Sequence, residues 1–510
     1  MGLLVFLLLV GGCRNEKEDI KGPEKPLLTI IHTNDIHGVI EGAGGLAQVA
    51  TYIKKYKEEH IDENIMVVDA GDLNRRQVYD EITCGSLIFK IVDTIGYDYL
   101  TLGNHELNYG YNYLMRNVES LKFSKMLNAN VKLVESNERL FLPYDVFEIE
   151  GVKVGIYSVL TDGNLYNYPN LSKVTVDDPY LETEKVLRDL RREKVDIVIG
   201  LVHLAVLADG EGRKYIHNDY LDLEGIDLII DGHDHEICPS NQTGCYYEYP
   251  MVVRNAGQLE KGIGITKIWY SENGISISEE KISVETINGN DPEILNESMQ
   301  DWEVMAIYNE VRKEYDRVLG HNHSDLTKEQ FLKQENHFSN MVADAYRHAA
   351  DSDIALVPGW NFKENVAQGN VSLTTLFEVI EHSGNWNQAD NIVVVNVRGK
   401  DIKKMMKRSL RFLPKGDRDF LHFSGMEITY KVKKNKHRRK IKRIMVNEEK
   451  LKPKQLYSVA MPMSLYRNRW RYSVLKKYKI EKQVGVDYLL VAEYIEKFGI
   501  NETMSRLIKE

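Results

Sequence analysis

The sequence predicts an α/β protein with two domains joined by a helical connector. Short apolar runs rich in Val, Ile and Leu alternate with helical patterns from Leu27 to about Ile287, and the alternation restarts near Glu335. Near-continuous apolar runs are typical of strands buried on both faces, and their alternation with helices indicates α/β layers. At 510 residues the chain is also too long for one hydrophobic core.

The domain boundaries follow from these changes in pattern. A polar segment begins at Asn288, and a long helical pattern follows it from Glu293 to Val318. We therefore predict a leader and tether, a first domain, a linker helix region and a second domain at residues 1–25, 26–286, 287–334 and 335–510.

The elements of the first domain can be predicted in chain order. Its strand-like runs are LLTII, IMVVDA, YLTLG, VDIVIGLV and IDLIIDG, and its clearest helices are Ala47–Glu59 and Leu181–Glu193. In the second domain we expect a helix at Asn340–Ala349, a strand at Asp353–Val357 and a solvated basic hairpin at Lys431–Arg443.

The N-terminus predicts export and lipid anchoring. Leu3–Val10 is an apolar run too short to span a bilayer, and it ends at Gly11-Gly12-Cys13 before a charged stretch. Small residues before a cysteine resemble a bacterial lipobox, so we expect lipidation at Cys13 and an extracytoplasmic, membrane-tethered body in the cell envelope. An ordinary signal peptide with an incidental cysteine is the alternative. Export also makes a disulfide between Cys238 and Cys245 possible.

The charge balance argues against a partner that is a nucleic acid polymer. The net charge is −10, whereas proteins that coat nucleic acids usually present a basic face. The sequence gives no sign of an obligate protein partner.

Metal-ligand residues follow five of the predicted strands. In an open α/β sheet, ligands gather beyond the carboxyl ends of the strands, so these residues are expected to meet there. The set is Asp35, His37, Asp72, Asn104, His203, His233 and His235, with His105 directly after Asn104.

This mixture of ligands predicts a site for two divalent metal ions. Two cations can neutralise phosphate oxygens and lower the pKa of a bound water, provided that one carboxylate bridges them, and Asp72 is the expected bridge. Imidazole and oxygen ligands suit Zn, Mn, Fe or Co better than Ca or Mg. If Asn104 binds metal, His105 points elsewhere and can assist a departing oxygen.

The motifs His32–Gly38 and Gly103–Glu106 resemble those of the calcineurin-like metallophosphoesterases, specifically their 5′-nucleotidase branch. The resemblance implies a metallophosphoesterase α/β sandwich followed by a C-terminal nucleotide-binding α/β domain. It also implies His105 as the catalytic histidine and two metal sites that share Asp72. The first would comprise Asp35, His37, Asp72 and His235, and the second Asp72, Asn104, His203 and His233.

At one position beside the metal site the chain departs from this family. Many relatives have an Asp four residues after the metal-binding Asn, and this chain has Asn108. An amide can orient His105 but cannot stabilise its cation as a carboxylate would, so we expect a slower or differently tuned catalyst.

The second domain matches the family less closely. The resemblance places Lys363 where relatives use a phosphate-binding Arg, although Lys lacks the bidentate fork. Phe420 and Tyr472 would be the two aromatic rings that stack on the base. If the segment before Tyr472 is extended, three arginines share one face and offer a replacement anion site, with a solvated edge as the alternative. These are Arg467, Arg469 and Arg471.

Together these observations predict a metal-dependent phosphohydrolase of 5′-nucleotides or related small phosphoesters. Hydroxide held between the metals would attack phosphorus while His105 assists the leaving oxygen. The alternatives are a 2′,3′-cyclic-nucleotide phosphodiesterase or a UDP-sugar pyrophosphohydrolase. A nucleotide-binding surface lipoprotein without turnover is the alternative from another class.

Overall fold

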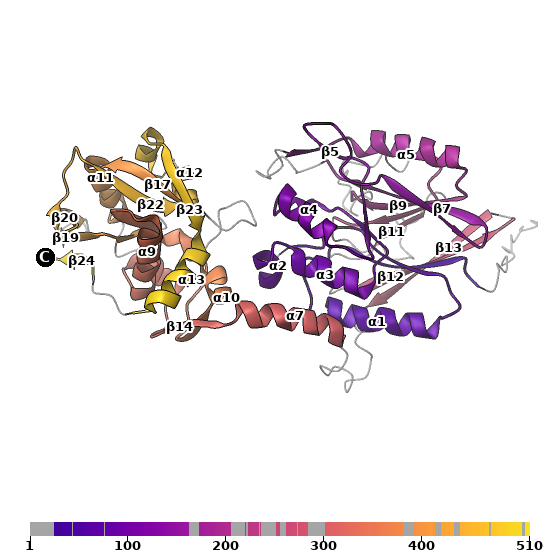
Figure 1. Cartoon of the computed structure of the whole chain (residues 1–510), viewed down its shortest axis with the longest axis horizontal. Coiled ribbons are helices and arrows are strands. Elements are labelled where there is room, and N and C mark those ends of the chain that lie inside the picture. Colours follow the sequence, from indigo (N-terminus) through magenta and orange to yellow (C-terminus); the bar gives the residue numbers. More distant parts are fainter. Residues whose placement is uncertain are drawn as a thin grey trace, which may run out of the picture.

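A computed structural model describes the chain at residues 25–42, 44–75, 77–162, 173–205, 220, 223–233, 235, 251–254, 262–272, 274–283, 301–380, 391–411, 413, 420–432, 439–468, 471–501 and 505–510. Two α/β domains lie side by side, and helix α7 (Trp302–Tyr315) runs from one to the other (Figure 1). The predicted two-domain architecture with a helical connector is therefore confirmed. The predicted domain boundaries remain expectations.

The N-terminal domain contains two packed sheets, in agreement with the α/β sandwich that the family resemblance implies. The larger has the order β13-β12-β1-β2-β3-β4, in which β1, β2, β3 and β4 are parallel and β12 and β13 are antiparallel. Its strands are β1 (Leu28–Thr33), β2 (Ile65–Asp69), β3 (Tyr99–Thr101), β4 (Lys125–Leu127), β12 (Gly262–Ser271) and β13 (Gly274–Ser283).

The second sheet has the order β11-β10-β9-β7-β6. Its strands are β6 (Tyr144–Ile149), β7 (Val152–Leu160), β9 (Ile197–His203), β10 (Leu228–Asp231) and β11 (Met251–Arg254). A separate antiparallel pair joins β5 (Val131–Leu133) to β8 (Val174–Val176).

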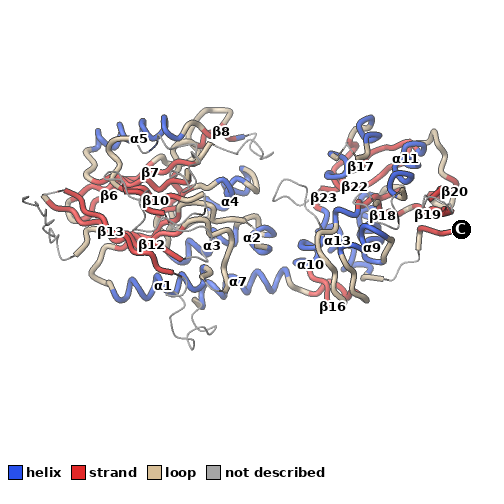
Figure 2. Tube along the Cα trace, turned by 180° about the vertical axis from the view of Figure 1, so that it is seen from behind, coloured by secondary structure: helices blue, strands red, loops and turns tan. Residues whose placement is uncertain are grey.

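Helices cover the outer face of each sheet, which gives four layers (Figure 2). Ile30 and Val68 of the first sheet pack against Ile199 and Ile230 of the second. On the outside, α5 covers the second sheet, and helices of the first domain together with α7 cover the first sheet. The helices of this domain are α1 (Leu46–Glu59), α2 (Val78–Ile82), α3 (Ser86–Ile95), α4 (Tyr111–Glu119) and α5 (Pro179–Glu193), with the 3₁₀ turn η1 (Asn104–Leu107).

The C-terminal domain is built on a five-stranded sheet with the order β18-β15-β22-β17-β23. Helices α9, α10 and α13 cover one face, while α11 and a four-stranded sheet, β21-β20-β19-β24, cover the other. The helices are α8 (Lys328–Lys333), α9 (His337–Ala350), α10 (Leu373–Val379), α11 (Gly399–Ser409), α12 (Met463–Arg467) and α13 (Asp487–Phe498), with 3₁₀ turns η7 (Gly359–Asn361) and η8 (Ser473–Lys477). The strands are β14 (Val318–Asn322), β15 (Ile354–Pro358), β16 (Gly369–Ser372), β17 (Asn391–Arg398), β18 (Leu421–Ser424), β19 (Met426–Val432), β20 (Arg439–Val446), β21 (Glu449–Lys450), β22 (Leu456–Pro462), β23 (Ile480–Val486) and β24 (Leu507–Lys509).

Most of the predicted elements are present, with small shifts at their ends. Helices α1, α5 and α9 and strand β15 fall where the sequence places them, and the basic hairpin corresponds to the antiparallel pair β19–β20. Arg467 does not lie in an extended segment, because it is the last residue of helix α12. Cys13, Cys238, Cys245 and Arg469 lie outside the described residues.

Within the described part of the chain, every helix is too short or too polar to cross a bilayer.

Candidate active site

Six of the seven predicted metal ligands converge in two clusters at the carboxyl ends of the central strands, and the seventh, Asn104, lies on η1. The first cluster contains Asp35, His37 and His235, and the second contains Asp72, His203 and His233. Within each cluster the ligand atoms lie within 4.8 Å of one another. Strands β1 and β2 of one sheet and β9 and β10 of the other all end here, so both sheets contribute to both clusters.

The two clusters are neighbours. A Cβ atom added to Gly232 would lie 3.0 Å from Nδ1 of His203 and 3.1 Å from Oδ2 of Asp35. The rings of His37 and His105 are also close, with centroids 5.4 Å apart. The site is therefore one continuous centre between the ends of the two sheets.

Strained backbone holds most of these ligands in place. Five of the seven predicted ligands have positive φ angles between 50° and 94°, namely Asp35, His37, Asp72, His233 and His235. Residues with a side chain rarely adopt this region, and such strain concentrates at functional sites. The turns after β1, β2 and β10 thus aim these side chains at a common point.

The first cluster fits a divalent cation. Nε2 of His37 lies 2.9 Å from Nε2 of His235, which in turn lies 3.3 Å from Oδ1 of Asp35. Two ring nitrogens and a carboxylate oxygen therefore face one small space. A cation in that space would satisfy all three groups at once.

The second cluster also fits a cation. His203 lies with Nδ1 2.7 Å from the Ala70 carbonyl, so Nδ1–H donates to it and Nε2 faces the Asp72 carboxylate at 3.3 Å. A backbone carbonyl that accepts from the other ring nitrogen is typical of metal-binding histidines. Burial alone would lower the pKa of His203, but Asp72 outweighs burial and raises that pKa to about 10. The position therefore favours a positive charge.

His105 lies beside the second cluster on η1, with Asn104 before it. Its Nε2 is 3.8 Å from Oδ2 of Asp72, and its Nδ1 is 2.7 Å from the Asn108 amide nitrogen. Burial lowers the pKa of His105 to about 4, although Asp72 opposes that shift. The contact that the sequence predicts between positions 105 and 108 is thus present.

Several buried residues that were not assigned a role from sequence support the site. Glu106 accepts hydrogen bonds from the backbone N–H groups of Gly103, Asp72 and Asn74 at 2.6, 3.0 and 3.2 Å, which ties the loop after β2 to the loop after β3. Asp231 accepts from Leu204 N and Gly232 N, both at 2.8 Å. The sequence does point to Glu106, because it is the last residue of the Gly103–Glu106 motif.

The predicted substrate residues lie in the C-terminal domain. Phe420 and Tyr472 are 1% and 2% exposed and belong to one apolar cluster, so their rings are covered in this conformation. Lys363 is half-buried after η7, and Arg467 is exposed at the end of α12. The Arg471 guanidinium lies 5.8 Å from the ring centroid of Trp360.

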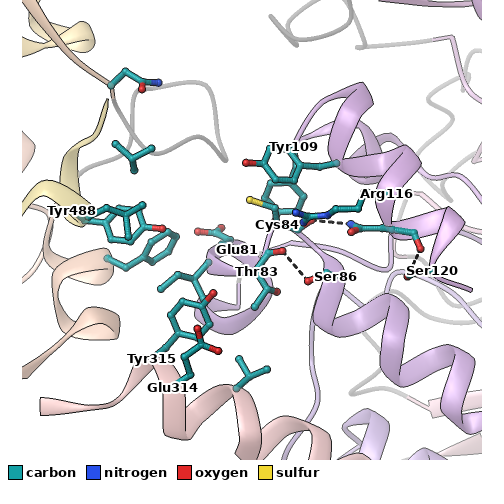
Figure 3. Close-up of a pocket in the computed structure, with 18 residues that line it drawn as sticks. Glu81, Thr83, Cys84, Ser86, Tyr109, Arg116, Ser120, Glu314, Tyr315 and Tyr488 are labelled. Atoms are coloured by element: carbon teal, nitrogen blue, oxygen red, sulfur yellow. Dashed lines mark hydrogen bonds between the residues drawn. The ribbon is translucent and has the colours of Figure 1, made fainter. Parts of the chain in front are cut away.

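A cavity of about 800 Å³ opens between the two domains (Figure 3). Tyr109 and Arg116 line it from the first domain, and Tyr315 of α7 and Tyr488 of the second domain line it from the other side. The residues of the two metal clusters do not line this cavity. Tyr109 is the link between them, because its hydroxyl donates at 3.1 Å to Asp80 of helix α2, which also accepts from the backbone of Arg75.

Comparisons with known proteins agree with the fold. Residues 28–236 match the family model for calcineurin-like phosphoesterases, and residues 317–476 match that for the 5′-nucleotidase C-terminal domain. The chain therefore belongs to the 5′-nucleotidase family, with the phosphoesterase domain first and the C-terminal domain second.

Named relatives are distant in sequence. The trifunctional nucleotide phosphoesterase YfkN of Bacillus subtilis is 24% identical over 94% of this chain, which spans 35% of that protein. The 5′-nucleotidase of Vibrio cholerae is 24% identical over 69% of this chain and 71% of its own length. A Staphylococcus aureus protein, provisionally named a 5′-nucleotidase and solved with α-ketoglutarate, has the same fold: TM-score 0.54 and 18% identity over 95% of this chain and 100% of that one.

Proposed function

We propose that this phosphohydrolase acts on 5′-nucleotides and releases inorganic phosphate and a nucleoside. The observation that carries the proposal is the pair of metal clusters with His105 beside them, at 3.8 Å from Asp72. A second domain of the 5′-nucleotidase type adds a place for the nucleoside part of the substrate.

The metal ligands are proposed residue by residue. Asp35, His37, Asp72 and His235 hold one cation, and Asp72 is shared with the second. The remaining ligands of the second are Asn104, His203 and His233. The bound cations supply charge neutralisation for phosphate oxygens and a lowered pKa for a water nucleophile.

The protein's own groups orient the reaction. Asn108 holds the His105 ring through Nδ1, so that Nε2 faces the space beside Asp72, where a leaving oxygen can receive a proton. Glu106 fixes the two loops that carry Asp72 and His105 relative to each other.

In the second domain we propose that four cationic side chains contribute positive charge for the substrate, namely Lys363, Arg467, Arg469 and Arg471. We also propose that Phe420 and Tyr472 pack against the base. Stacking on both rings requires that their present neighbours move, because both rings are covered.

A panel of substrates and metals tests this function. The purified protein, stripped of metal and reloaded with Mn, Zn or Co, is assayed on AMP, 2′,3′-cyclic AMP, UDP-glucose and p-nitrophenyl phosphate. We expect the highest kcat/KM on AMP and loss of activity in His203→Ala. Preference for the cyclic nucleotide or for UDP-glucose would replace the proposal with one of the two related activities. No turnover with any metal would contradict it.

We further propose that Cys13 is lipidated and tethers the enzyme outside the cytoplasm. Incorporation of radiolabelled palmitate in the wild type, and its absence in Cys13→Ser, is the expected result. Equal labelling of both proteins would contradict lipidation at this residue.

A further inference from the structure

Arg75 brings a guanidinium group into the metal centre from the loop between β2 and α2. Its Nη1 lies 2.6 Å from Nε2 of His105, on the edge of the ring that also faces Asp72. Arg75 thus lies within reach of any phosphoryl group that contacts both His105 and the second metal cluster.

The loop is built to hold Arg75 in this position. Arg75 has a φ of 135°, a strained value for a residue with a side chain. Its backbone N–H donates to Oδ2 of the fully buried Asp80 at 2.7 Å, and the same oxygen accepts from the Tyr109 hydroxyl at 3.1 Å. The loop also packs on the turn that carries His37, because a Cβ on Gly38 would lie 3.3 Å from the Arg75 carbonyl oxygen.

The contact between Arg75 and His105 cannot persist while His105 donates a proton. A guanidinium has only donors, so it must use the lone pair of Nε2. A neutral imidazole accepts at one ring nitrogen only, so this contact requires the ring proton on Nδ1 and the oxygen of the Asn108 amide turned towards it. While Arg75 is bonded at Nε2, that nitrogen has no proton to give to a leaving oxygen. The two groups can act together only if Arg75 moves from Nε2 to another acceptor when the substrate enters.

The phosphoryl group is the acceptor that this geometry fits. The planar fork of a guanidinium matches two oxygens of one phosphate, and such charge-assisted pairs are stronger than neutral hydrogen bonds. A terminal phosphate offers the fork two negative non-bridging oxygens, whereas a diester carries a single negative charge.

We propose that Arg75 is a substrate-binding residue that transfers from His105 to the phosphoryl oxygens and selects for terminal phosphomonoesters. This inference rests on the proposed phosphohydrolase function. If Arg75 acts in this way, a residue of the first domain determines the preference of the enzyme for phosphomonoesters over phosphodiesters.

The test compares Arg75→Ala and Arg75→Lys with the wild type, all loaded with Mn. The substrates are p-nitrophenyl phosphate, a monoester, and bis(p-nitrophenyl) phosphate, a diester. We expect Arg75→Ala to lower kcat/KM for the monoester about 10- to 100-fold, with a much smaller loss for the diester. Inorganic phosphate should inhibit the variant more weakly by a similar factor, added guanidinium chloride should restore part of the activity, and Arg75→Lys should fall between the two.

Arg188→Ala is the matched control, since Arg188 is exposed on α5, and it should behave as the wild type. An equal loss for monoester and diester with unchanged phosphate inhibition would overturn the inference, because it would show that Arg75 only positions His105. If the wild type hydrolyses neither ester, the proposed function fails separately. In that case, calorimetric titration of the Mn-loaded proteins with inorganic phosphate tests whether Arg75 binds phosphate. We expect Arg75→Ala to bind phosphate more weakly than the wild type. Equal binding by the two proteins would overturn the inference.

Discussion

Two glycines are as important as the ligand side chains in forming the metal centre. A Cβ on Gly103 would lie 2.1 Å from Oδ1 and 2.3 Å from the backbone nitrogen of Asp72. A Cβ on Gly71 would lie 2.7 Å from Gly103 N and 2.8 Å from Nδ1 of His203. The loops after β2 and β3 therefore meet with no room for a side chain between them.

Gly103→Ala should displace Asp72 and weaken metal binding. The added methyl group overlaps backbone as well as side-chain atoms, so rotation of Asp72 alone cannot relieve it. We expect the metal content of the purified protein and kcat on AMP to fall about 10- to 100-fold. Gly485→Ala is the control, because its nearest neighbours, at 3.2 Å or more, belong to the flexible side chain of Leu490. Normal metal content in Gly103→Ala would contradict this account.

The sequence was sufficient to predict that the candidate ligands converge, but apart from Asn108 it did not indicate the groups that support them. His203 and His233 follow apolar runs, and the carboxyl ends of parallel strands meet, so their convergence could be expected. Arg75 lies in a polar loop and Asp80 in the short helix α2, and neither segment has a periodic pattern in the sequence. Their roles depend on a strained φ angle and a buried carboxylate, which only the folded backbone reveals.

At the scale of elements, the strands were predictable from their apolar runs, whereas their division into two sheets was implied only by the family resemblance. A strand buried on both faces has the same apolar composition whether a helix or another sheet covers it. Ile30 of β1 and Ile199 of β9 belong to the apolar cluster between the two sheets, and no local pattern in the sequence distinguishes that environment from one beneath a helix. The extended conformation predicted for Arg467 is wrong because helix α12 has only five residues, too few for a helical period to be visible in the sequence.

An ion cluster that joins α5 to β5 gives a prediction at this scale. Burial favours the neutral form of Glu182, but hydrogen bonds from Lys132, Lys185 and Arg139 at 2.8, 2.6 and 2.8 Å outweigh it and lower the pKa to about 2. The folded pKa is below the unfolded value of 4.5. The stabilisation is therefore complete above pH 4.5 and is lost as the pH falls towards about 2.

Glu182→Gln should accordingly lower the free energy of unfolding by about 1–3 kcal/mol at pH 7, because it removes the charge that three cations share. Of these, Lys132 is nearly buried and keeps Asp177 as a partner at 2.6 Å, while Arg139 and Lys185 are partly exposed. The difference from the wild type, measured by urea unfolding, should shrink as the pH falls from 5 to 3. Glu184→Gln on the same helix is the control and should have little effect at either pH. A difference that does not change with pH would show that the carboxylate charge is not responsible.

For the whole molecule, helix α2 connects the contact between the domains to the metal centre. Ile82 is 7% exposed and packs in the apolar core of the C-terminal domain. The Tyr79 hydroxyl donates to Oδ2 of Asp316 at 2.7 Å, and Thr374 donates to the other oxygen at 2.7 Å. Asp80 of the same helix holds the Arg75 backbone. The relative position of the two domains is thus linked mechanically to Arg75.

Ile82→Ala tests this link. Removing the buried side chain should weaken the contact by about 2–5 kcal/mol, so the domains should separate more often and α2 should hold Asp80 less firmly. We expect a larger radius of gyration in small-angle scattering and a loss of kcat/KM that is greater for AMP than for p-nitrophenyl phosphate, because only the nucleotide needs the second domain. Ile61→Ala, at a side chain that is 81% exposed, should change neither value. Equal losses for both substrates with unchanged scattering would mean that α2 acts on the metal centre alone and does not couple it to the second domain.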